Sequence, residues 1–176
     1  MVNVNMSVDL CGVKLSNPVI PASGTFGFGI EMAGEFDLNV LGGISLKGTT
    51  REPRFGNPTP RIAECRNGMI NSVGRWGVLN SVGLQNPGVD IVIAEELPHL
   101  RTIFHKPIVA NISGFSVEEY EECCEKAAQA PETDIIEVNI SCPNVHGGGM
   151  AFGTDPAMAA NISAASSAVR AIGPGV

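Results

Sequence analysis

A cysteine and two asparagines stand together in the hexapeptide Asn139-Ile140-Ser141-Cys142-Pro143-Asn144, directly after the apolar run 134–138. A cysteine thiolate is a strong nucleophile, although a thiol with the reference pKa of about 8.5 is only a few per cent ionised near neutral pH. Asparagine amides both donate and accept hydrogen bonds, which suits a ligand with N–H and C=O groups along its edge. The alternative is a packing role for Cys142, since most buried cysteines are small hydrophobic residues.

The composition limits what this cysteine can do. The chain has 176 residues, is 44% hydrophobic and carries a net charge of −7 with a pI near 4.9, which argues against a nucleic-acid partner. No window approaches the roughly 18 apolar residues of a membrane span, so we expect a cytoplasmic protein with no membrane partner. The five cysteines are an odd number with no C-x-x-C pair, so we expect neither disulfides nor a metal site. Four of them are interpreted as packing residues: Cys11, Cys65, Cys123 and Cys124.

Short runs rich in Val and Ile alternate with helical patterns along the chain. We expect four strands buried on both faces, at 18–22, 43–47, 107–111 and 135–139. A capping box at 116–119 predicts a helix over 116–130, and Asp155-Pro156 predicts the start of a second helix over 155–172. Strands that alternate with helices are typical of a parallel sheet.

Two architectures have this order of elements, an open doubly wound sheet and a closed barrel. No glycine run has the G-x-G-x-x-G spacing of a dinucleotide-binding sheet, and no P-loop is present. Polar residues instead follow each predicted strand: Ser23, Lys47, Asn111, and Asn139 with Cys142. In a barrel the carboxyl ends of the strands converge on the face that carries the site. We therefore expect an α/β fold, a (β/α)8 TIM barrel with one pocket that collects these side chains.

The predicted barrel needs more strands than this sequence supplies. Such barrels usually have about 250 residues, whereas four strands precede Gly173. We therefore expect residues 1–176 to be the N-terminal half of one barrel domain, truncated before the fifth strand, with about four βα units and a long excursion after the second strand. Half a barrel leaves sheet edges uncovered, which favours aggregation or pairing with another chain.

The excursion between Thr49 and Asn86 is longer than a plain loop and contains a repeat. The heptapeptide at 68–74, GMINSVG, recurs nine residues later at 77–83 as GVLNSVG. Two copies are too few for a repeat architecture. Two interpretations stay open: a small duplication tolerated in a surface excursion, or a segment that lies over the site and binds ligand through one copy.

Five motifs in order resemble those of class 1 dihydroorotate dehydrogenases, and the first motif is most similar to class 1B catalytic subunits. They are PASGTFGFG at 21–29, KGTT at 47–50, GNPTPR at 56–61, NSVGLQNPG at 80–88 and NISCPN at 139–144. Together they extend over nearly the whole chain. The resemblance implies a barrel that binds FMN and oxidises dihydroorotate to orotate in pyrimidine synthesis.

The resemblance also implies a role for individual residues. Cys142 matches the general base that takes a proton while the flavin takes a hydride. The residues that match flavin contacts are Ser23, Lys47, Gly48, Asn111 and Asn139. Those that match substrate contacts are Lys47, Asn80, Ser81, Val82, Gly83, Leu84, Asn139 and Asn144. The family has one N-S-V-G copy, and we assign its role to the second copy because that copy alone continues into LQNPG.

Class 1B membership would further imply a partner subunit that carries FAD and a 2Fe-2S cluster and passes electrons to NAD, together with a homodimer contact. Two alternatives remain. One is a related flavin barrel acting on another pyrimidine, which would share the N-x-S-C-P turn, although the complete N-S-V-G-L-Q-N loop argues against it. The other is an inactive fragment, because the missing strands and the duplicated loop both depart from the family pattern.

Overall fold

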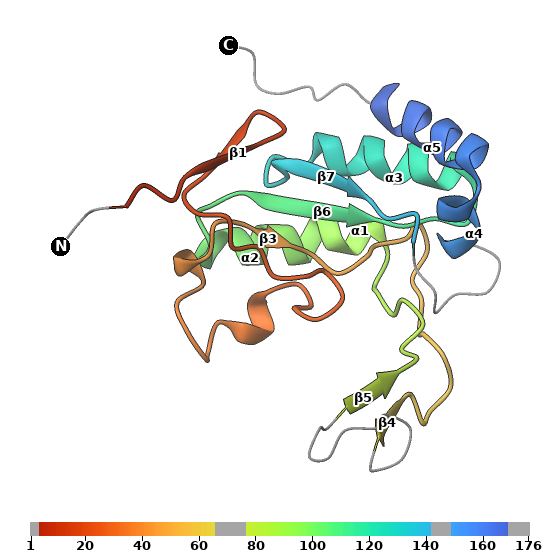
Figure 1. The fold of residues 1–176 in the computed structure, drawn as a ribbon, viewed down its shortest axis with the longest axis horizontal. Coiled ribbons are helices and arrows are strands. Elements are labelled where there is room, and N and C mark those ends of the chain that lie inside the picture. The colour runs from red at the N-terminus through yellow and green to blue at the C-terminus, as the bar shows by residue number, and fades with distance from the viewer. Residues whose placement is uncertain (1–3, 66–76, 142–148, 169–176) are drawn as a thin grey trace.

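The computed structural model describes residues 4–65, 77–141 and 149–168. Its centre is a parallel sheet of three strands in the order β3 (Ile44–Ser45), β6 (Ile108–Ile112) and β7 (Ile135–Val138). These strands coincide with three of the four that the sequence predicts, and Figure 1 shows β6 and β7 side by side with their carboxyl ends pointing the same way.

The prediction of a strand at 18–22, the first along the chain, is wrong, because the structure has irregular backbone there. Pro18 and Pro21 have no N–H to donate to a sheet ladder, so this run cannot pair as a regular strand. The segment still lies against the sheet edge, since the N–H of Gly42 donates to the carbonyl oxygen of Val19 at 2.9 Å. The apolar composition of the run therefore predicted its position better than its conformation.

An antiparallel hairpin near the N-terminus, β1 (Val8–Leu10) and β2 (Val13–Leu15), was not predicted. Its turn places Cys11 at φ 53° and Gly12 at φ 84°. Cys11 is exposed, so the packing interpretation is wrong for this cysteine. The interpretation is confirmed for Cys123 and Cys124, which are both fully buried.

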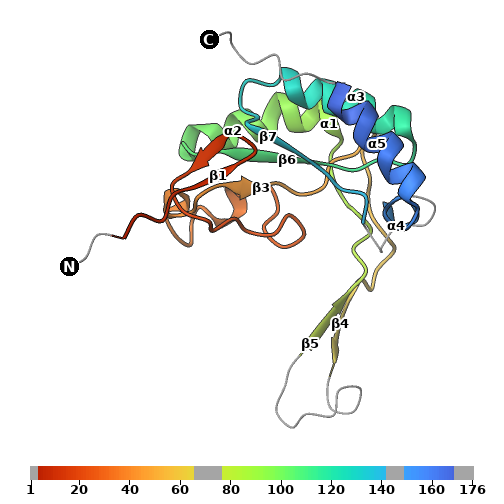
Figure 2. The same cartoon turned by 45° about the horizontal axis from the view of Figure 1, so that its top comes forward.

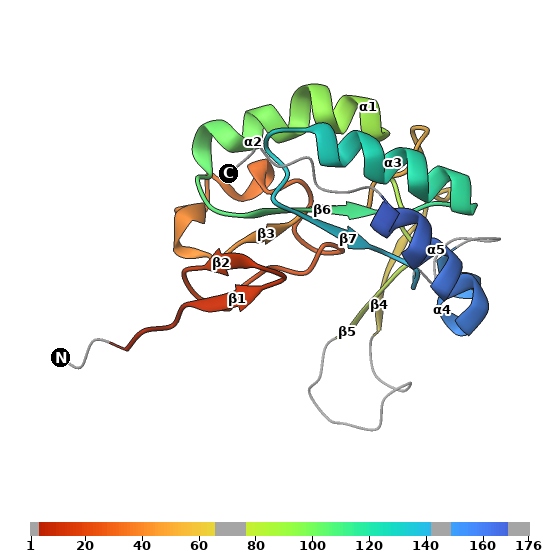
Figure 3. The same ribbon diagram turned by 90° about the horizontal axis from the view of Figure 1, so that it is seen from above.

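Helices cover one face of the sheet (Figure 3). A continuous helical stretch comprises α1 (Val89–Ile91), the π-helical turn η3 (Val92–Glu96) and α2 (Leu97–Ile103). Pro98 lies at the start of α2, where its ring would clash with the carbonyl of Ala94 in a regular helix. The π-helical turn just before Pro98 accommodates this conflict.

The predicted capping box begins α3 (Val117–Gln129). Ser116 Oγ accepts a hydrogen bond from the N–H of Glu119 at 3.3 Å, and the Glu119 carboxylate accepts one from the N–H of Phe115 at 2.8 Å rather than from Ser116 itself. The second predicted helix is α5 (Pro156–Ala168), with Asp155 Oδ1 accepting from the N–H of Ala157 at 2.9 Å. Both predicted helices are confirmed within the described residues.

The described chain resumes after the cysteine turn with a short helix, α4 (Gly149–Thr154). Two single turns of 3-10 helix precede the sheet, η1 (Ile30–Met32) and η2 (Leu38–Val40). Within the described ranges, no helix is both long and apolar enough to cross a membrane.

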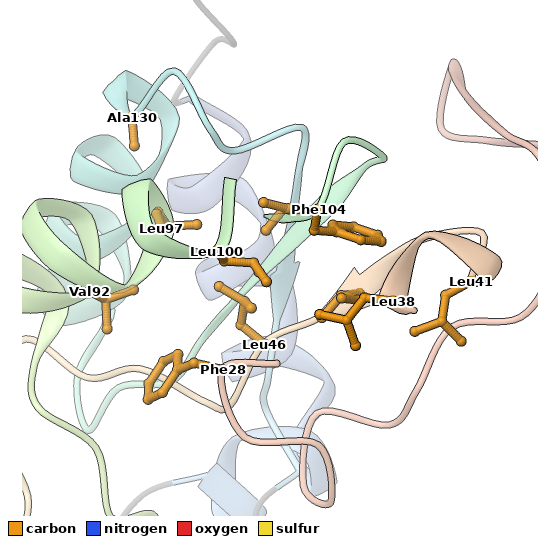
Figure 4. Close-up of a cluster of buried hydrophobic side chains, with 11 residues drawn as sticks. Phe28, Leu38, Leu41, Leu46, Val92, Leu97, Leu100, Phe104 and Ala130 are labelled. Carbon is orange, nitrogen blue, oxygen red and sulfur yellow. The ribbon is translucent and has the colours of Figure 1, made fainter. Parts of the chain in front are cut away.

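The core consists of two apolar clusters between the sheet and its helices. The first joins Leu46 to side chains of α2 and of the N-terminal segment, including Leu97, Leu100 and Phe28 (Figure 4). The second lies between β6 and α3 and contains Tyr120, Cys123 and Cys124. Each fully buried Leu or Phe contributes roughly 1.5–3 kcal/mol, so these clusters hold the sheet to the helices.

The excursion after β3 forms an antiparallel hairpin of β4 (Ile62–Cys65) and β5 (Gly77–Asn80). Figure 2 shows it projecting away from the helices. The second copy of the repeat supplies β5, while the first copy lies outside the described residues. The described strands do not close into a barrel. The structure contains one part of the predicted (β/α)8 architecture, a parallel sheet with helices on its outer face.

Candidate active site

The register of the parallel sheet places a row of polar side chains on the face opposite the helices. Ser45 pairs with Val109, and Asn111 pairs with Glu137. Because side chains alternate along a strand and paired residues share a face, these side chains all point away from the apolar clusters that contain Ala110 and its neighbours. Ser45 Oγ donates to Glu137 Oε2 at 2.6 Å, which links β3 to β7 across the middle strand.

Two of the predicted flavin-binding asparagines meet on this face. Asn139 Nδ2 donates to Asn111 Oδ1 at 3.3 Å. The backbone of Asn139 is fixed as well, since its N–H donates to Ile112 O at 2.8 Å and its carbonyl oxygen accepts from Tyr120 Oη at 2.6 Å. Tyr120 is fully buried, so α3 positions Asn139 from the helix side of the sheet.

The predicted Lys47-Gly48 motif continues β3 beside these asparagines. The N–H of Lys47 donates to Gly27 O at 2.8 Å, and the N–H of Thr49 donates to Asn111 O at 2.9 Å. Gly48 is buried, and a methyl group built on it would lie 3.0 Å from Asn111 Oδ1. A side chain here would therefore force neighbouring side chains to shift, and the motif lies beside the polar cluster.

Asn86 fixes the base of the excursion beside the site. It is only 5% exposed, and its side-chain oxygen accepts hydrogen bonds from the backbone N–H groups of Thr50 at 3.2 Å and Gly88 at 2.9 Å. Its amide nitrogen donates to Thr50 Oγ1 at 3.0 Å and to Leu84 O at 2.9 Å. One buried asparagine thus joins both ends of the excursion and holds the backbone of Leu84.

Asn57 positions the predicted substrate loop that follows Asn80, the last residue of β5. Asn57 Nδ2 donates to Ser81 O at 3.1 Å and to Ser81 Oγ at 3.0 Å, and its N–H donates to Val82 O at 2.9 Å. Gly83 has φ 80°, and a methyl group there would lie 2.7 Å from Asn57 Cγ. Hydrogen bonds between Asn57 and Ser81, which are 24 residues apart, therefore join the motif GNPTPR to the motif NSVG.

Leu84 is the loop residue that reaches the polar cluster. It adopts φ 56°, an uncommon conformation for a non-glycine residue, and its Cδ1 would lie 2.8 Å from a methyl group on Gly48. This contact supports the interpretation that the excursion lies over the site. The first repeat copy lies outside the described residues, so the choice of the second copy stays a prediction.

The remaining predicted residues have different outcomes. Ser23 lies in a turn, where the N–H of Thr25 donates to Ala22 O at 3.0 Å, and no contact among the described residues joins it to the asparagines. Cys142 and Asn144 lie outside the described residues. The described chain leads to them through Ser141, whose N–H donates to Asn139 Oδ1 at 3.2 Å.

Sequence reasoning missed five residues that lie in or beside the site: Asn57, Asn86, Ser113, Tyr120 and Glu137. Asn86 stands before Pro87-Gly88, a turn signal that marks a backbone-binding asparagine. Glu137 interrupts an otherwise apolar strand, which marks it as a residue on the face away from the helices. Tyr120 and Ser113 carry no such signal, because only the packing of α3 and the pairing of β6 bring them to the site.

Comparison with known proteins matches residues 5–173 to the model of the family described as dihydroorotate dehydrogenase. The chain is 55% identical over 158 residues to the dihydroorotate dehydrogenase B (NAD(+)) catalytic subunit of Geobacillus kaustophilus, a match that covers 90% of this chain and 47% of that protein. It is 48% identical over 167 residues to the subunit of the same name from Enterococcus faecalis, which covers 95% of this chain and 51% of the relative.

A solved structure of DHODH from Eimeria tenella in complex with ferulenol has a TM-score of 0.65 with this chain at 19% sequence identity. The match covers 94% of this chain and 43% of that one, and it shows a shared fold. The chain thus spans about half the length of the curated relatives it matches.

Proposed function

Because the chain belongs to the dihydroorotate dehydrogenase family, we propose that it carries part of the site for FMN-dependent oxidation of (S)-dihydroorotate to orotate in pyrimidine biosynthesis. The observation that supports this most directly is the cluster formed by Gly48, Asn111 and Asn139 at the carboxyl ends of the strands, with Leu84 held over it.

The residues present fit a flavin. Asn111 is 1% exposed, and its Nδ2 has no hydrogen-bond partner in the part of the chain that the structure describes. Such a buried donor is costly unless a ligand accepts from it, and the carbonyl oxygens and ring nitrogens of an isoalloxazine are suitable acceptors. Gly48 presents no side chain, and the atom closest to a methyl group there is the flexible end of Leu84. Flavin contacts are accordingly proposed for Ser23, Lys47, Gly48, Asn111 and Asn139.

Bound FMN would supply the hydride acceptor. In the proposed reaction, the Cys142 thiolate removes a proton from one ring carbon of dihydroorotate while the adjacent carbon loses a hydride, so that a carbon–carbon double bond forms. Lys47 offsets the negative charge of the substrate carboxylate and of the reduced flavin. Substrate contacts are also proposed for Asn80, Ser81, Val82, Gly83, Leu84, Asn139 and Asn144.

The network around Asn139 explains how such a site would keep its geometry. The backbone N–H and the carbonyl oxygen of Asn139 are both hydrogen-bonded, and its side-chain amide is joined to Asn111, so the start of the cysteine turn has little freedom. A base is effective only when it is held within hydrogen-bond distance of the proton that it removes. Tyr120 is therefore proposed to position the segment that leads to Cys142.

The proposal extends to the assembly. The relatives are named NAD(+)-type catalytic subunits, which supports a partner subunit that passes electrons to NAD, with FAD and a 2Fe-2S cluster on that partner. We also propose a homodimer contact and a cytoplasmic location. The barrel is proposed to be closed by strands other than those described.

The test uses the full-length protein, purified aerobically and examined by absorbance near the flavin bands. We expect a yellow protein whose flavin absorbance falls when dihydroorotate is added without oxygen. A Cys142→Ala variant should retain the flavin but lose its reduction at least 100-fold, as expected for loss of a general base. Bleaching by a neutral dihydropyrimidine in place of dihydroorotate would favour the related flavin barrel, and a protein that binds no FMN would refute the proposal.

A further inference from the structure

Ser113 is a buried polar residue of the site to which neither the sequence motifs nor the proposed mechanism gives a role. It is 2% exposed, and its Oγ has no hydrogen-bond partner in the described part of the chain. Buried hydroxyl groups are nearly always hydrogen-bonded in folded proteins. An unpartnered one therefore indicates a group that the structure does not contain.

The position of Ser113 is fixed by the strand beside it. Its N–H donates to Thr49 O at 2.8 Å, while the N–H of Thr49 donates to Asn111 O at 2.9 Å. Ser113 follows Asn111 by two residues, so the alternation of the strand directs both side chains to the same face. A methyl group on Gly48 would lie 3.0 Å from Ser113 Oγ and 3.0 Å from Asn111 Oδ1. The hydroxyl and the carboxamide thus flank the same glycine.

Asn111 and Ser113 thus both flank Gly48, and each carries a side-chain donor without a partner in the described residues, the Asn111 amide nitrogen and the Ser113 hydroxyl. The other buried side-chain atoms without a partner in the described residues belong to Arg54, Thr133 and Ser166. Thr133 lies in the turn before β7, where its N–H donates to Ala130 O at 3.1 Å, and this turn is at the opposite end of the sheet from Gly48. Asn111 and Ser113 therefore lie beside the predicted flavin residue Gly48, and Thr133 does not.

We propose that Ser113 is a further flavin-binding residue, whose hydroxyl acts with the Asn111 amide to hold the polar edge of the isoalloxazine ring against Gly48. This inference rests on the proposed function. The ring edge offers several carbonyl oxygens and ring nitrogens, so two adjacent donors can both be satisfied. The flexible end of Leu84 is the group that must move to admit it.

The test measures FMN affinity in the full-length protein after removal of the flavin, using the quenching of FMN fluorescence on binding. Ser113→Ala should raise the Kd for FMN about three- to tenfold, the loss expected for one hydrogen bond. Thr133→Val is the matched control, because it removes an equally unpartnered hydroxyl far from Gly48, and its Kd should stay within about twofold of the wild type.

Thermal unfolding separates a ligand contact from a structural one. Ser113→Ala loses no side-chain hydrogen bond to the described residues, so the flavin-free variant should unfold at the same temperature as the flavin-free wild type or higher, and only the FMN-bound form should lose stability. If the alanine variant does not fold, Ser113→Cys keeps the shape with a weaker donor, and its Kd should also rise.

Two outcomes would overturn this inference alone, and a third would overturn it together with the proposed function. An unchanged Kd in Ser113→Ala, with normal FMN binding by the wild type, would refute the role of Ser113 and leave the proposed function intact. An equal loss of stability with and without FMN would assign the hydroxyl a partner inside the protein. A wild type that binds no FMN would instead refute the proposed function, and this inference with it.

Discussion

Replacing Gly48 with alanine tests the close approach at the centre of the site. The added methyl group would lie 2.8 Å from Leu84 Cδ1, 3.0 Å from Asn111 Oδ1 and 3.0 Å from Ser113 Oγ. These three atoms come from the excursion and from β6 with its extension, so no single shift relieves all three contacts. The Leu84 end can rotate away, but Asn111 and Ser113 are 1% and 2% exposed, and the backbone of both is hydrogen-bonded to Thr49.

The expected cost follows from these contacts. Overpacking a close-packed region by one methyl group costs about 1–3 kcal/mol. For a domain of this size each kcal/mol lowers the midpoint of thermal unfolding by about 2–4 °C. Displacement of the Asn111 carboxamide should also break its contact with Asn139 and weaken FMN binding at least about tenfold, because the proposed flavin donor moves with it.

The assay compares urea unfolding and FMN titration for Gly48→Ala and Gly34→Ala in the full-length protein. Gly34 is the matched control, because a methyl group there meets nothing within 4 Å. It should change the free energy of unfolding by less than about 1 kcal/mol and leave FMN affinity unchanged. If the two variants behave alike in both measurements, Gly48 does not lie at a close approach and the packing described for the site is incorrect.

Three further predictions concern the excursion and the core. Asn86→Asp should lower the free energy of unfolding by about 2–4 kcal/mol, measured by urea titration, because Thr50 Oγ1 and Leu84 O each lose a buried donor. Deleting residues 68–76 removes one repeat copy and should leave FMN and dihydroorotate affinities within about threefold, measured by titration, since the contacts of residues 80–84 come from the second copy. Burial, followed by the neighbouring Cys124 and Glu122, raises the pKa of the Cys123 thiol from 9.0 to about 12. The contribution of the Cys123 thiol to stability should be complete below pH 9. It should be lost progressively from pH 9 to 12, because the thiol ionises first in the unfolded state. A Cys123→Ala variant should therefore show a shallower decline of unfolding free energy with pH over that range.

Each of these has a specific contrary result. An Asn86→Asp variant as stable as the wild type would mean that water replaces the lost donors and that the base of the excursion is not sealed. Loss of dihydroorotate binding on deletion of 68–76 would assign a function to the first repeat copy. Equal slopes for Cys123→Ala and the wild type above pH 9 would show that this thiol is not the group that titrates on unfolding.

Three of the four predicted strands and both predicted helices could be obtained from sequence, because their signals are local. The runs at 107–111 and 135–139 are apolar and β-branched, and the caps at Ser116 and Asp155 satisfy backbone N–H groups within the same helix turn. The wrong strand at 18–22 shows the limit of an apolar pattern, since its two prolines remove the donors that a ladder needs.

Sequence alone also placed Lys47, Asn111 and Asn139 at the ends of predicted strands, and parallel pairing is enough to bring such residues to one edge. It could not show that the Asn139 amide bonds to Asn111, because these residues are 28 apart and the register of the sheet decides whether they meet. It also could not show that Leu84 lies on Gly48, because these residues are 36 apart and meet only where Asn86 anchors the excursion. Residue types and their order therefore determined the chemistry available to this protein. The tertiary structure alone decided which donors are left without a partner, since that depends on how every neighbouring group has been satisfied.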